Sequence, residues 1–452
     1  MNLHFIGICG TGAYQVAILA KRVGYNVSGC DICLNKNYNI LQKEGIMVYI
    51  EHSVEHLKNV DLVIVSPIFL HLKIKNKEVE ESIRTKHCVT WEEFLAQEII
   101  KDKKTVVISG THGKTTICSL LTQILSKEID NIFTICGENE NNVKNLNENP
   151  VYIIEAEEYN ENFLHYSPDI LCINNIEVDH PSQFSDISES VRLYKKLIRQ
   201  VKKNGYIILN IDDENIKELL EDIDVEDYNV IFYTRERLFK ISSVQCKVIN
   251  FTCDENALNF TIYFDGEEYS RLFNSIGGVH NVYNLVAIYI IASLFNVNKE
   301  IIEDFFYNVK SVPRRMELVK KDGNRLIFND YAHHPTQMRC VLSVLISQYQ
   351  KDVCVIWKPN QYDRTIYFYQ EYIDVLSVAK CVFLLDVAGS GDDKNVSISF
   401  CEMIDELRRR GVVTFYVNEN ELRSFVNKYS SSDSVCVLFS TDYGNEIINK
   451  IT

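Results

Sequence analysis

Residues 110–116 carry the side chains best suited to chemistry in this chain. They read Gly-Thr-His-Gly-Lys-Thr-Thr after an apolar segment. A glycine turn at a helix N-terminus directs backbone N–H groups toward one point, which suits a chain of phosphates. Lys114 would then reach the outer phosphates, and Thr115 would offer its hydroxyl to Mg²⁺. The spacing departs from the general phosphate loop, which has a glycine where Ile108 stands. The segment predicts a nucleotide site, and the alternative is an ordinary strand-to-helix turn with a surface lysine.

Acidic residues and a histidine follow two further apolar segments. Glu155 ends the first of these segments, and His180 follows the second. Carboxylates and imidazoles at strand ends beside a phosphate loop are the groups that a Mg²⁺–nucleotide site needs. We therefore predict that Glu155 and His180 belong to this site. Glu157 and Glu158, in contrast, we interpret as solvated loop acids.

A second glycine turn lies near the N-terminus. Gly7, Gly10 and Gly12 separate an apolar segment from an apolar-periodic one, and Asp31 ends the next apolar segment. This arrangement is similar to a dinucleotide-binding unit, but its spacing is G-x-x-G-x-G rather than G-x-G-x-x-G. A nicotinamide oxidoreductase is therefore a weak alternative, and we expect a nucleotide diphosphate at the first helix N-terminus. Ser66 follows the third expected strand, where ligands collect in open α/β sheets.

The elements that must position these residues alternate between strands and helices along the chain. We predict an α/β fold with three domains. Residues 1–101 form a Rossmann-like domain, residues 102–312 a phosphate-loop, ATPase-like domain, and residues 313–452 a second Rossmann-like domain with a parallel sheet. Within the central domain, an apolar helix is expected over residues 285–294.

Composition excludes several classes of function. The 452 residues include 47 basic and 62 acidic side chains, a formal charge of −15, which argues against nucleic-acid and anionic-membrane partners. No apolar run approaches the ~20 residues of a membrane span. The N-terminus lacks the basic region of a signal peptide, so we expect a cytoplasmic protein, monomeric or weakly dimeric. Cys30 and Cys33 are the only C-x-x-C among 14 cysteines, which favours reduced thiols and no zinc site.

Five motifs in this order resemble the Mur ligase family, the ATP-dependent amide-forming enzymes of peptidoglycan synthesis. The motifs occupy residues 110–116, 155–158, 175–180, 278–284 and 330–336. The resemblance implies that the N-terminal domain binds a UDP-sugar, the central domain ATP, and the C-terminal domain an amino acid. The implied reaction joins an amino acid, with L-alanine expected, to the lactyl carboxylate of UDP-N-acetylmuramate. It would proceed through an acyl phosphate, with ATP and Mg²⁺ as cofactors.

The resemblance also implies a role for individual residues. The ATP-binding residues would be Gly110, Thr111, His112, Gly113, Lys114, Thr115, Thr116, His280, Asn281, Asn284, Asp330 and one of Arg314 and Arg315. The UDP-sugar would bind to Gly7, Cys9, Gly10, Thr11, Gly12, Asp31 and Ser66. The metal ligands would be Thr115, Glu155 and His180. Catalytic residues would be Lys114, Glu155, His180, Arg364 and one of His333 and His334, which would accept the amine proton. The amino acid would contact Tyr331, His333 and Arg364.

The chain departs from the family pattern mainly in its C-terminal domain. Asn360 replaces a histidine of the alanine-adding members, Gln361 stands where some members have a second arginine, and Asp363 adds a negative charge. These changes leave the expected ATP chemistry untouched and bear on the identity of the amine. Three alternatives stay open: another amino acid, recycling of murein tripeptide, and a non-catalytic nucleotide-binding regulatory protein.

Overall fold

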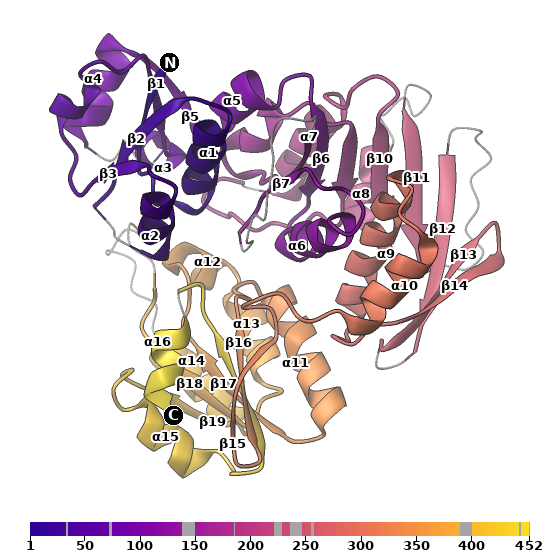
Figure 1. Cartoon of the computed structure of the whole chain (residues 1–452). Helices are drawn as coiled ribbons and strands as arrows, with labels where there is room; N and C mark the ends of the chain where they lie inside the picture. Colours follow the sequence, from indigo (N-terminus) through magenta and orange to yellow (C-terminus); the bar gives the residue numbers. More distant parts are fainter. Residues whose placement is uncertain are drawn as a thin grey trace.

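The computed structural model describes residues 1–32, 35–71, 75–137, 150–184, 186–220, 228–235, 246–254, 257–388, 400–442 and 444–451. They form three α/β lobes, each built on its own sheet (Figure 1). The N-terminal lobe, in indigo, and the central lobe, in purple to pink, lie above the orange and yellow C-terminal lobe. The predicted class of three α/β domains is confirmed, and the boundaries after residues 101 and 312 stay predictions.

The N-terminal lobe has a five-stranded parallel sheet in the order β3-β2-β1-β4-β5. Its strands are β1 (Asn2–Ile6), β2 (Asn26–Cys30), β3 (Met47–Tyr49), β4 (Leu62–Val65) and β5 (His87–Thr90). Its helices are α1 (Thr11–Arg22), α2 (Lys36–Lys43), η1 (Val54–Leu57), α3 (Pro67–His71), α4 (Lys77–Thr85), α5 (Trp91–Phe94) and η2 (Leu95–Ile99). Alternation along β1 sends Leu3 and Phe5 toward α1, and Ile6 toward α4.

The central lobe has a nine-stranded sheet in the order β14-β13-β12-β11-β10-β9-β6-β8-β7, parallel from β7 to β12. Its strands are β6 (Lys104–Ser109), β7 (Ile132–Ile135), β8 (Val151–Glu155), β9 (Ile170–Ile173), β10 (Tyr206–Asn210), β11 (Asn229–Thr234), β12 (Cys246–Cys253), β13 (Asn259–Phe264) and β14 (Glu267–Phe273). Its helices are α6 (Lys114–Leu125), η3 (Tyr159–His165), α7 (Ile187–Ile198), α8 (Glu214–Leu219), α9 (Val279–Leu294) and α10 (Lys299–Asn308). Helix α9 begins at Val279 rather than at residue 285, because the N–H groups of Asn281 and Val282 already donate to the Gly278 carbonyl.

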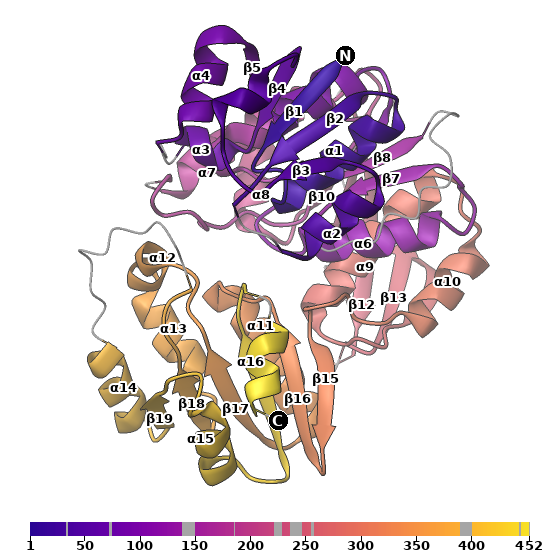
Figure 2. The same cartoon turned by 60° about the vertical axis from the view of Figure 1, so that its left-hand side comes forward.

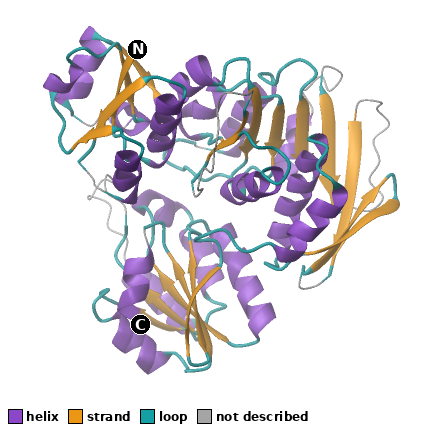
Figure 3. Cartoon of the chain, viewed as in Figure 1, coloured by secondary structure: helices purple, strands orange, loops and turns teal. Residues whose placement is uncertain are grey.

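The C-terminal lobe has a six-stranded sheet in the order β15-β16-β20-β17-β18-β19, in which β15 alone is antiparallel to its neighbour. Its strands are β15 (Glu317–Asp322), β16 (Arg325–Asp330), β17 (Asp352–Trp357), β18 (Cys381–Leu384), β19 (Val413–Tyr416) and β20 (Ser434–Phe439). Its helices are α11 (Pro335–Tyr349), α12 (Tyr362–Tyr367), α13 (Tyr369–Leu376), α14 (Phe400–Arg409), α15 (Leu422–Tyr429) and α16 (Gly444–Ile451), which flank the sheet (Figure 3).

Two further features concern the whole chain. Cys354 and Cys381 form a disulfide, so the expectation of reduced thiols is wrong for this pair. The two cysteines are direct partners in the register of β17 and β18, which sequence separation does not reveal. Among the described helices, we find none with both the length and the apolar character needed to cross a lipid bilayer.

Candidate active site

The phosphate loop joins β6 to α6 and turns at two glycines. Their backbone angles φ are +121° at Gly110 and +89° at Gly113, which side chains disfavour. A Cβ atom on Gly113 would lie 2.4 Å from Oδ1 of Asn284 and 2.8 Å from Nδ2 of Asn174. Only glycine therefore fits where the loop enters the helix, and the first turn of α6 opens onto a cavity as an anion site requires.

Lys114 is the first residue of α6, and its side chain is buried. Its ammonium donates to the carbonyls of Gly110 at 2.7 Å and Thr111 at 3.3 Å, and it lies 3.9 Å from Oε2 of Glu158. Burial alone would lower the pKa of Lys114, but the charges of Glu158 and Glu157 outweigh this effect and raise that pKa. The lysine is therefore held charged beside the cavity.

Thr115 and Glu155 meet at the bottom of the loop, as predicted for a metal site. The Thr115 hydroxyl donates to Glu155 at 2.9 Å, and the Gly137 N–H donates to the same carboxylate at 2.8 Å. Arg315 reaches across from the C-terminal lobe and donates from Nη2 to Oγ1 of Thr115 at 3.3 Å. Oxygen atoms that could bind a cation and a guanidinium that could bind an anion thus face the same space.

Arg314 points elsewhere, although the sequence left open which of the two arginines meets the phosphates. Its guanidinium donates to the carbonyls of Thr441 at 2.6 Å and Asp442 at 2.8 Å. Both arginines lie against the ring of Tyr331, at 4.7 Å for Arg314 and 4.9 Å for Arg315. Arg315 is therefore the one that the structure brings to the phosphate loop.

Three charged residues continue the site beyond Lys114. Nε2 of His180 lies 3.3 Å from Oε1 of Glu157. Burial alone would lower the pKa of His180, but its hydrogen bond with Glu157 outweighs this and raises that pKa. The same hydrogen bond and the Lys114 charge lower the pKa of Glu157 to about 2, although its side chain is 52% exposed, in line with its interpretation as a solvated acid. The interpretation of Glu158 as a solvated acid is wrong, because its side chain is 3% exposed and accepts from Tyr194.

A cavity of about 830 Å³ lies where the three lobes meet. Thr11 and Gly12 line it from the N-terminal lobe. The central lobe contributes Gly113, Lys114, Thr115, Glu155 and His180, and the C-terminal lobe Arg314, Arg315, Tyr331, His333 and Arg364. Its volume is within the range of small-molecule sites, so it can hold a substrate next to the phosphate loop.

The N-terminal turn divides the predicted UDP-sugar residues into two groups. Thr11 and Gly12 begin α1 and face the cavity. The others hold the turn in shape: the Cys9 N–H donates to Asp31 at 2.9 Å, and the Gly10 N–H donates to the Gly7 carbonyl at 3.2 Å. The Ser66 N–H donates to the carbonyl of Ile6, within the sheet. These five residues do not line the cavity.

A second cavity, of about 620 Å³, adjoins the first at Gly113 and Arg315. The predicted residues that line it are His112, Thr116, His280, Asn281, Asn284 and Asp330. Asp330 is buried, and its carboxylate accepts from the N–H groups of Met316 at 2.6 Å and Ala332 at 2.7 Å. Burial raises the pKa of Asp330 and lowers that of His280 to about 4, so the histidine is neutral.

Arg364 ties the C-terminal lobe to the central one. It lies on α12, at the end of the C-terminal lobe that faces the other two (Figure 2). Its Nη2 is 3.0 Å from Oδ1 of Asp179, and its Nε donates to the Asp179 carbonyl at 3.0 Å. Both side chains are buried. Burial would raise the pKa of Asp179, but the hydrogen bond with His333 and the Arg364 charge hold it well below its usual range.

The two adjacent histidines have different positions. His334 caps α11: its Nδ1 accepts from the Thr336 N–H at 3.2 Å, and its Nε2 donates to the Val178 carbonyl at 3.2 Å. Both ring nitrogens are thereby used, away from the cavity. His333 lines the cavity; its Nδ1 lies 3.1 Å from the Tyr331 carbonyl and therefore carries a proton, and its Nε2 lies 3.9 Å from Oδ2 of Asp179.

Four residues outside the predicted set also build the site. Asn174 bonds to Asn284 at 3.1 Å, Glu177 to His112 at 3.1 Å, and Asp179 pairs with Arg364. Gln337 reaches the second ring nitrogen of His112 at 2.9 Å. The first three lie between positions 174 and 179, after β9. Glu177 and Asp179 belong to the motif at residues 175–180, in which no individual role was predicted for these two positions. Gln337 lies in no such motif, and its partner lies in another lobe.

Comparisons with known proteins agree on one family. The family models described as "Mur ligase family, catalytic domain", "Mur ligase middle domain" and "Mur ligase, glutamate ligase domain" match residues 2–99, 108–292 and 314–440. The chain therefore belongs to the Mur ligase family. Membership makes it an enzyme of the ATP-dependent ligase class and leaves the nicotinamide oxidoreductase without support.

Individual relatives cover nearly the whole chain. The UDP-N-acetylmuramate–L-alanine ligase of Dictyoglomus turgidum is 28% identical over 90% of this chain and 86% of its own length. The enzyme of the same name from Aquifex aeolicus is 28% identical over 97% of this chain and 94% of its own. The solved UDP-N-acetylmuramate–alanine ligase of Thermotoga maritima has a TM-score of 0.77 at 20% identity, covering 100% of this chain and 98% of its own. A murein peptide ligase from Psychrobacter arcticus has a TM-score of 0.69 at 19% identity, covering 100% and 98%.

Proposed function

We propose that this protein is an ATP-dependent ligase that joins L-alanine to the lactyl carboxylate of UDP-N-acetylmuramate, in the cytoplasm. The observation that carries the proposal is the cavity of about 830 Å³ where the three lobes meet. It places Gly12 of the N-terminal turn, Lys114 of the phosphate loop and Arg364 of the C-terminal lobe around one space. An acid, a phosphate donor and an amine can therefore meet there.

The chemistry requires all three components. A carboxylate is a poor electrophile, so its oxygen first attacks the γ-phosphorus of ATP and ADP leaves. The amine then attacks the carbonyl carbon of the acyl phosphate, and inorganic phosphate leaves with the carboxylate oxygen. The first step brings two anions together, and the charged Lys114 beside the cavity offsets their repulsion.

Mg²⁺ fits the groups at the base of the loop. The Thr115 hydroxyl and the Glu155 carboxylate are oxygen donors 2.9 Å apart, and both line the cavity. Such hard oxygen ligands suit Mg²⁺, which when bound neutralises phosphate charge. We further propose that His180, whose Nε2 faces Glu157, holds a second cation.

We assign the nucleoside of ATP to the cavity of about 620 Å³. His280, Asn281 and Asn284 would contact the base, because they lie on the first turns of α9 beside the phosphate loop. Asp330 would bind the ribose, and Arg315 would bind the phosphates, since it lines both cavities.

The amine would bind between the central and C-terminal lobes. Arg364 is the proposed partner of the amino-acid carboxylate, which would share the guanidinium with Asp179. His333 would accept the amine proton at Nε2, because its Nδ1 faces a carbonyl. His334 would hold the N-terminus of α11 instead.

A second candidate function is the same ligase reaction with an amine substrate whose side chain is more polar than that of L-alanine. Asn360 and Gln361 line the large cavity near Arg364, together with Glu419 and Asp442. Lys358 binds both of these acids, Glu419 at 3.0 Å and Asp442 at 2.8 Å. A wall of amide and carboxylate groups favours an amine whose side chain forms hydrogen bonds, as in another amino acid or a murein tripeptide.

The test is phosphate release from ATP and Mg²⁺ with UDP-N-acetylmuramate, one amine at a time, with the product mass recorded. Release with L-alanine and a gain of one alanyl residue supports the main proposal. Release only with another amine supports the second candidate. ATP binding without release for any amine contradicts both and favours a regulatory role. Lys114→Met is the control that separates this enzyme from a contaminating ATPase.

A further inference from the structure

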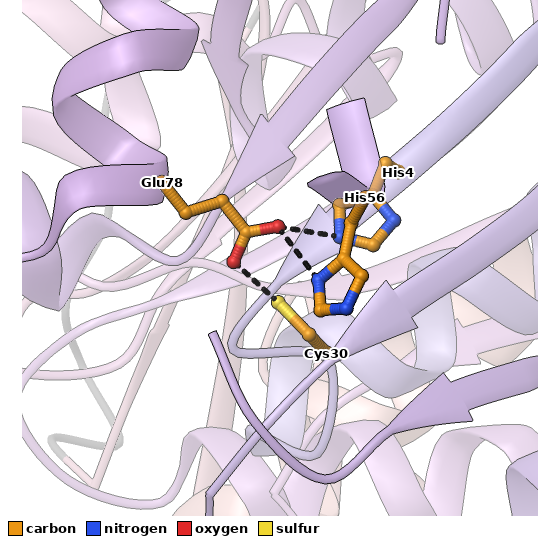
Figure 4. Close-up of side chains that lie close together, drawn as sticks. All are labelled: His4, Cys30, His56 and Glu78. Carbon is orange, nitrogen blue, oxygen red and sulfur yellow. Dashed lines mark hydrogen bonds and ion pairs between the residues drawn. The ribbon is translucent and has the colours of Figure 1, made fainter. Parts of the chain in front are cut away.

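A second cluster of reactive side chains lies in the core of the N-terminal lobe, away from both cavities. His4, Cys30, His56 and Glu78 point toward one another (Figure 4). Each offers one atom that binds metals, and these atoms all lie within 4.8 Å of one another. His4, Cys30 and Glu78 are at most 1% exposed. Such a set of nitrogen, sulfur and oxygen atoms is unusual in an apolar core.

The fold brings these four residues together from separate elements. In the parallel register of β1 and β2, His4 lies opposite Ser28 and Ile6 lies opposite Cys30. Alternation therefore directs His4 and Cys30 to the same face of the sheet. That face is covered by α4, which carries Glu78, and by η1, which carries His56.

Glu78 lies at the centre of the cluster. Its Oε1 is 3.2 Å from Nε2 of His4 and 3.1 Å from Nδ1 of His56. Its Oε2 is 3.1 Å from Sγ of Cys30. The ring of His56 stacks on Tyr49, with centroids 4.1 Å apart and planes 14° apart, which holds its Nδ1 toward the carboxylate. Tyr49, which is not part of the cluster, thus helps to hold His56 in place.

The imidazole of His4 has one ring nitrogen that lacks a hydrogen-bond partner. Its Nδ1 lies 3.0 Å from the Ser28 hydroxyl, whose oxygen also lies 3.3 Å from the Leu3 carbonyl. Its Nε2 is buried, faces Oε1 of Glu78 at 3.2 Å, and forms no hydrogen bond. A cation between this nitrogen and the carboxylate oxygen would bind both of them.

We propose that His4, Cys30, His56 and Glu78 bind a divalent transition-metal ion, and that Zn²⁺ fits this set best. Zinc takes four ligands of these types at about 2.0–2.3 Å in a tetrahedron, which separates the ligand atoms by about 3.3–3.8 Å. The ligand atoms lie as little as 3.1 Å apart and all within 4.8 Å of one another, so small side-chain movements would bring them to these values. A thiolate and a carboxylate balance the two positive charges, so the buried site is neutral.

His52 would support this site from outside the four ligands. Its Nδ1 is 3.2 Å from Sγ of Cys30 and 3.3 Å from Oε2 of Glu78. A hydrogen bond from such a ring orients a metal ligand and adjusts its charge. The main-chain carbonyl of Cys30 also accepts from the Gly7 N–H at 2.9 Å. The ion would thereby stabilise the glycine turn near the large cavity, a structural role that does not depend on the proposed ligase activity.

The test uses the full chain without an affinity tag. The protein is loaded with Zn²⁺ or Co²⁺ and dialysed against metal-free buffer. Bound metal is counted by mass spectrometry, and the Co²⁺ form is examined by absorption. We expect one tightly held ion per chain and a thiolate-to-cobalt charge-transfer band. Cys30→Ser should remove the band, and His56→Gln should keep it while weakening the affinity at least about tenfold.

The matched control is Cys88→Ser, because Cys88 lies on β5 of the same lobe, outside the cluster. It should retain both the ion and the band. An ion that dialysis removes, or a band equally strong in Cys30→Ser, overturns the proposal and leaves Glu78 bound by a protonated imidazole. If Cys30→Ser does not fold, the metal count of the wild type and the affinity of His56→Gln still decide. Phosphate release is not part of this test, so its outcome is independent of the proposed function.

Discussion

The phosphate loop can be tested with one methyl group at Gly113. Gly113→Ala would place Cβ 2.4 Å from Oδ1 of Asn284 and 2.8 Å from Nδ2 of Asn174, at a φ of +89°. These two amides are bonded to each other at 3.1 Å and are buried. The methyl group must therefore push them apart or move the loop, and either change alters the proposed binding site of the phosphates.

The chain contains a matched control for the strain of placing alanine at a positive φ. Gly266 has a φ of +85°, and nothing lies within 4 Å of a Cβ built there. Gly266→Ala therefore carries only the left-handed strain, about 1–2 kcal/mol, partly offset by the stiffer unfolded chain. Gly113→Ala has the same backbone strain and, in addition, the steric overlap and the loss of the amide–amide hydrogen bond. Together these should destabilise the loop by about 2–5 kcal/mol. The difference between the two variants isolates the contact from the backbone angle.

The assay is ATP affinity by titration calorimetry, with circular dichroism to check the fold. If the added strain acts on the bound loop, ATP affinity falls by about 30-fold to 5,000-fold in Gly113→Ala. Gly266→Ala should bind ATP like the wild type. A folded Gly113→Ala protein with unchanged ATP affinity would refute the assignment of this loop to the phosphates.

Three further outcomes follow from the contacts around the large cavity. Lys114→Met should lower the rate of phosphate release at least about 100-fold, because the charge beside the reacting anions is lost. Arg364→Met leaves Asp179 buried without its partner and should weaken lobe docking by about 3–5 kcal/mol, seen as a larger radius of gyration in X-ray scattering. Arg410→Met breaks only exposed ion pairs, those with Asp374 and Glu406, and should leave the scattering profile unchanged. In the metal-free protein, folding raises the pKa of His180 above 6.5, so its charged ring stabilises the fold fully below pH 6.5, and that contribution is lost as the pH rises through the raised pKa. His180→Gln should remove this loss, measured as thermal unfolding between about pH 6 and about pH 9.

The strands that sequence could predict are those with a continuous apolar core. Residues 106–108 and 170–173 are buried on both faces of a parallel sheet, so their apolar runs were sufficient. Three strands gave no such signal: β3, β5 and β15 lie at sheet edges and alternate poorly between polar and apolar residues. Their position depends on a neighbouring strand rather than on their own pattern, which is why sequence periodicity missed them.

The candidate site divides in the same way. The phosphate loop follows β6 directly and Glu155 ends β8, so local sequence was enough to place these two at one sheet edge. His180 lies further on, in the loop after β9, which ends at Ile173. Partnerships between lobes were not predictable, because they depend on how the lobes dock. The spacing of cysteines concerns only neighbours in the chain, whereas His4 and Glu78, 74 positions apart, meet across a sheet and a helix at 3.2 Å. Local motifs cannot reveal such a cluster.

The segment after β9 explains why lobe docking and chemistry would be linked. Three of its residues bind the C-terminal lobe: Glu177 accepts from Thr336, the Val178 carbonyl accepts from His334, and Asp179 pairs with Arg364. The next residue, His180, lines the large cavity. An acyl phosphate hydrolyses if water reaches it, so the amine site should be complete before the phosphate is transferred. The segment carries both the contacts that dock the C-terminal lobe and a residue that lines the cavity. Phosphate transfer would therefore depend on prior docking of the lobe that holds the amine site.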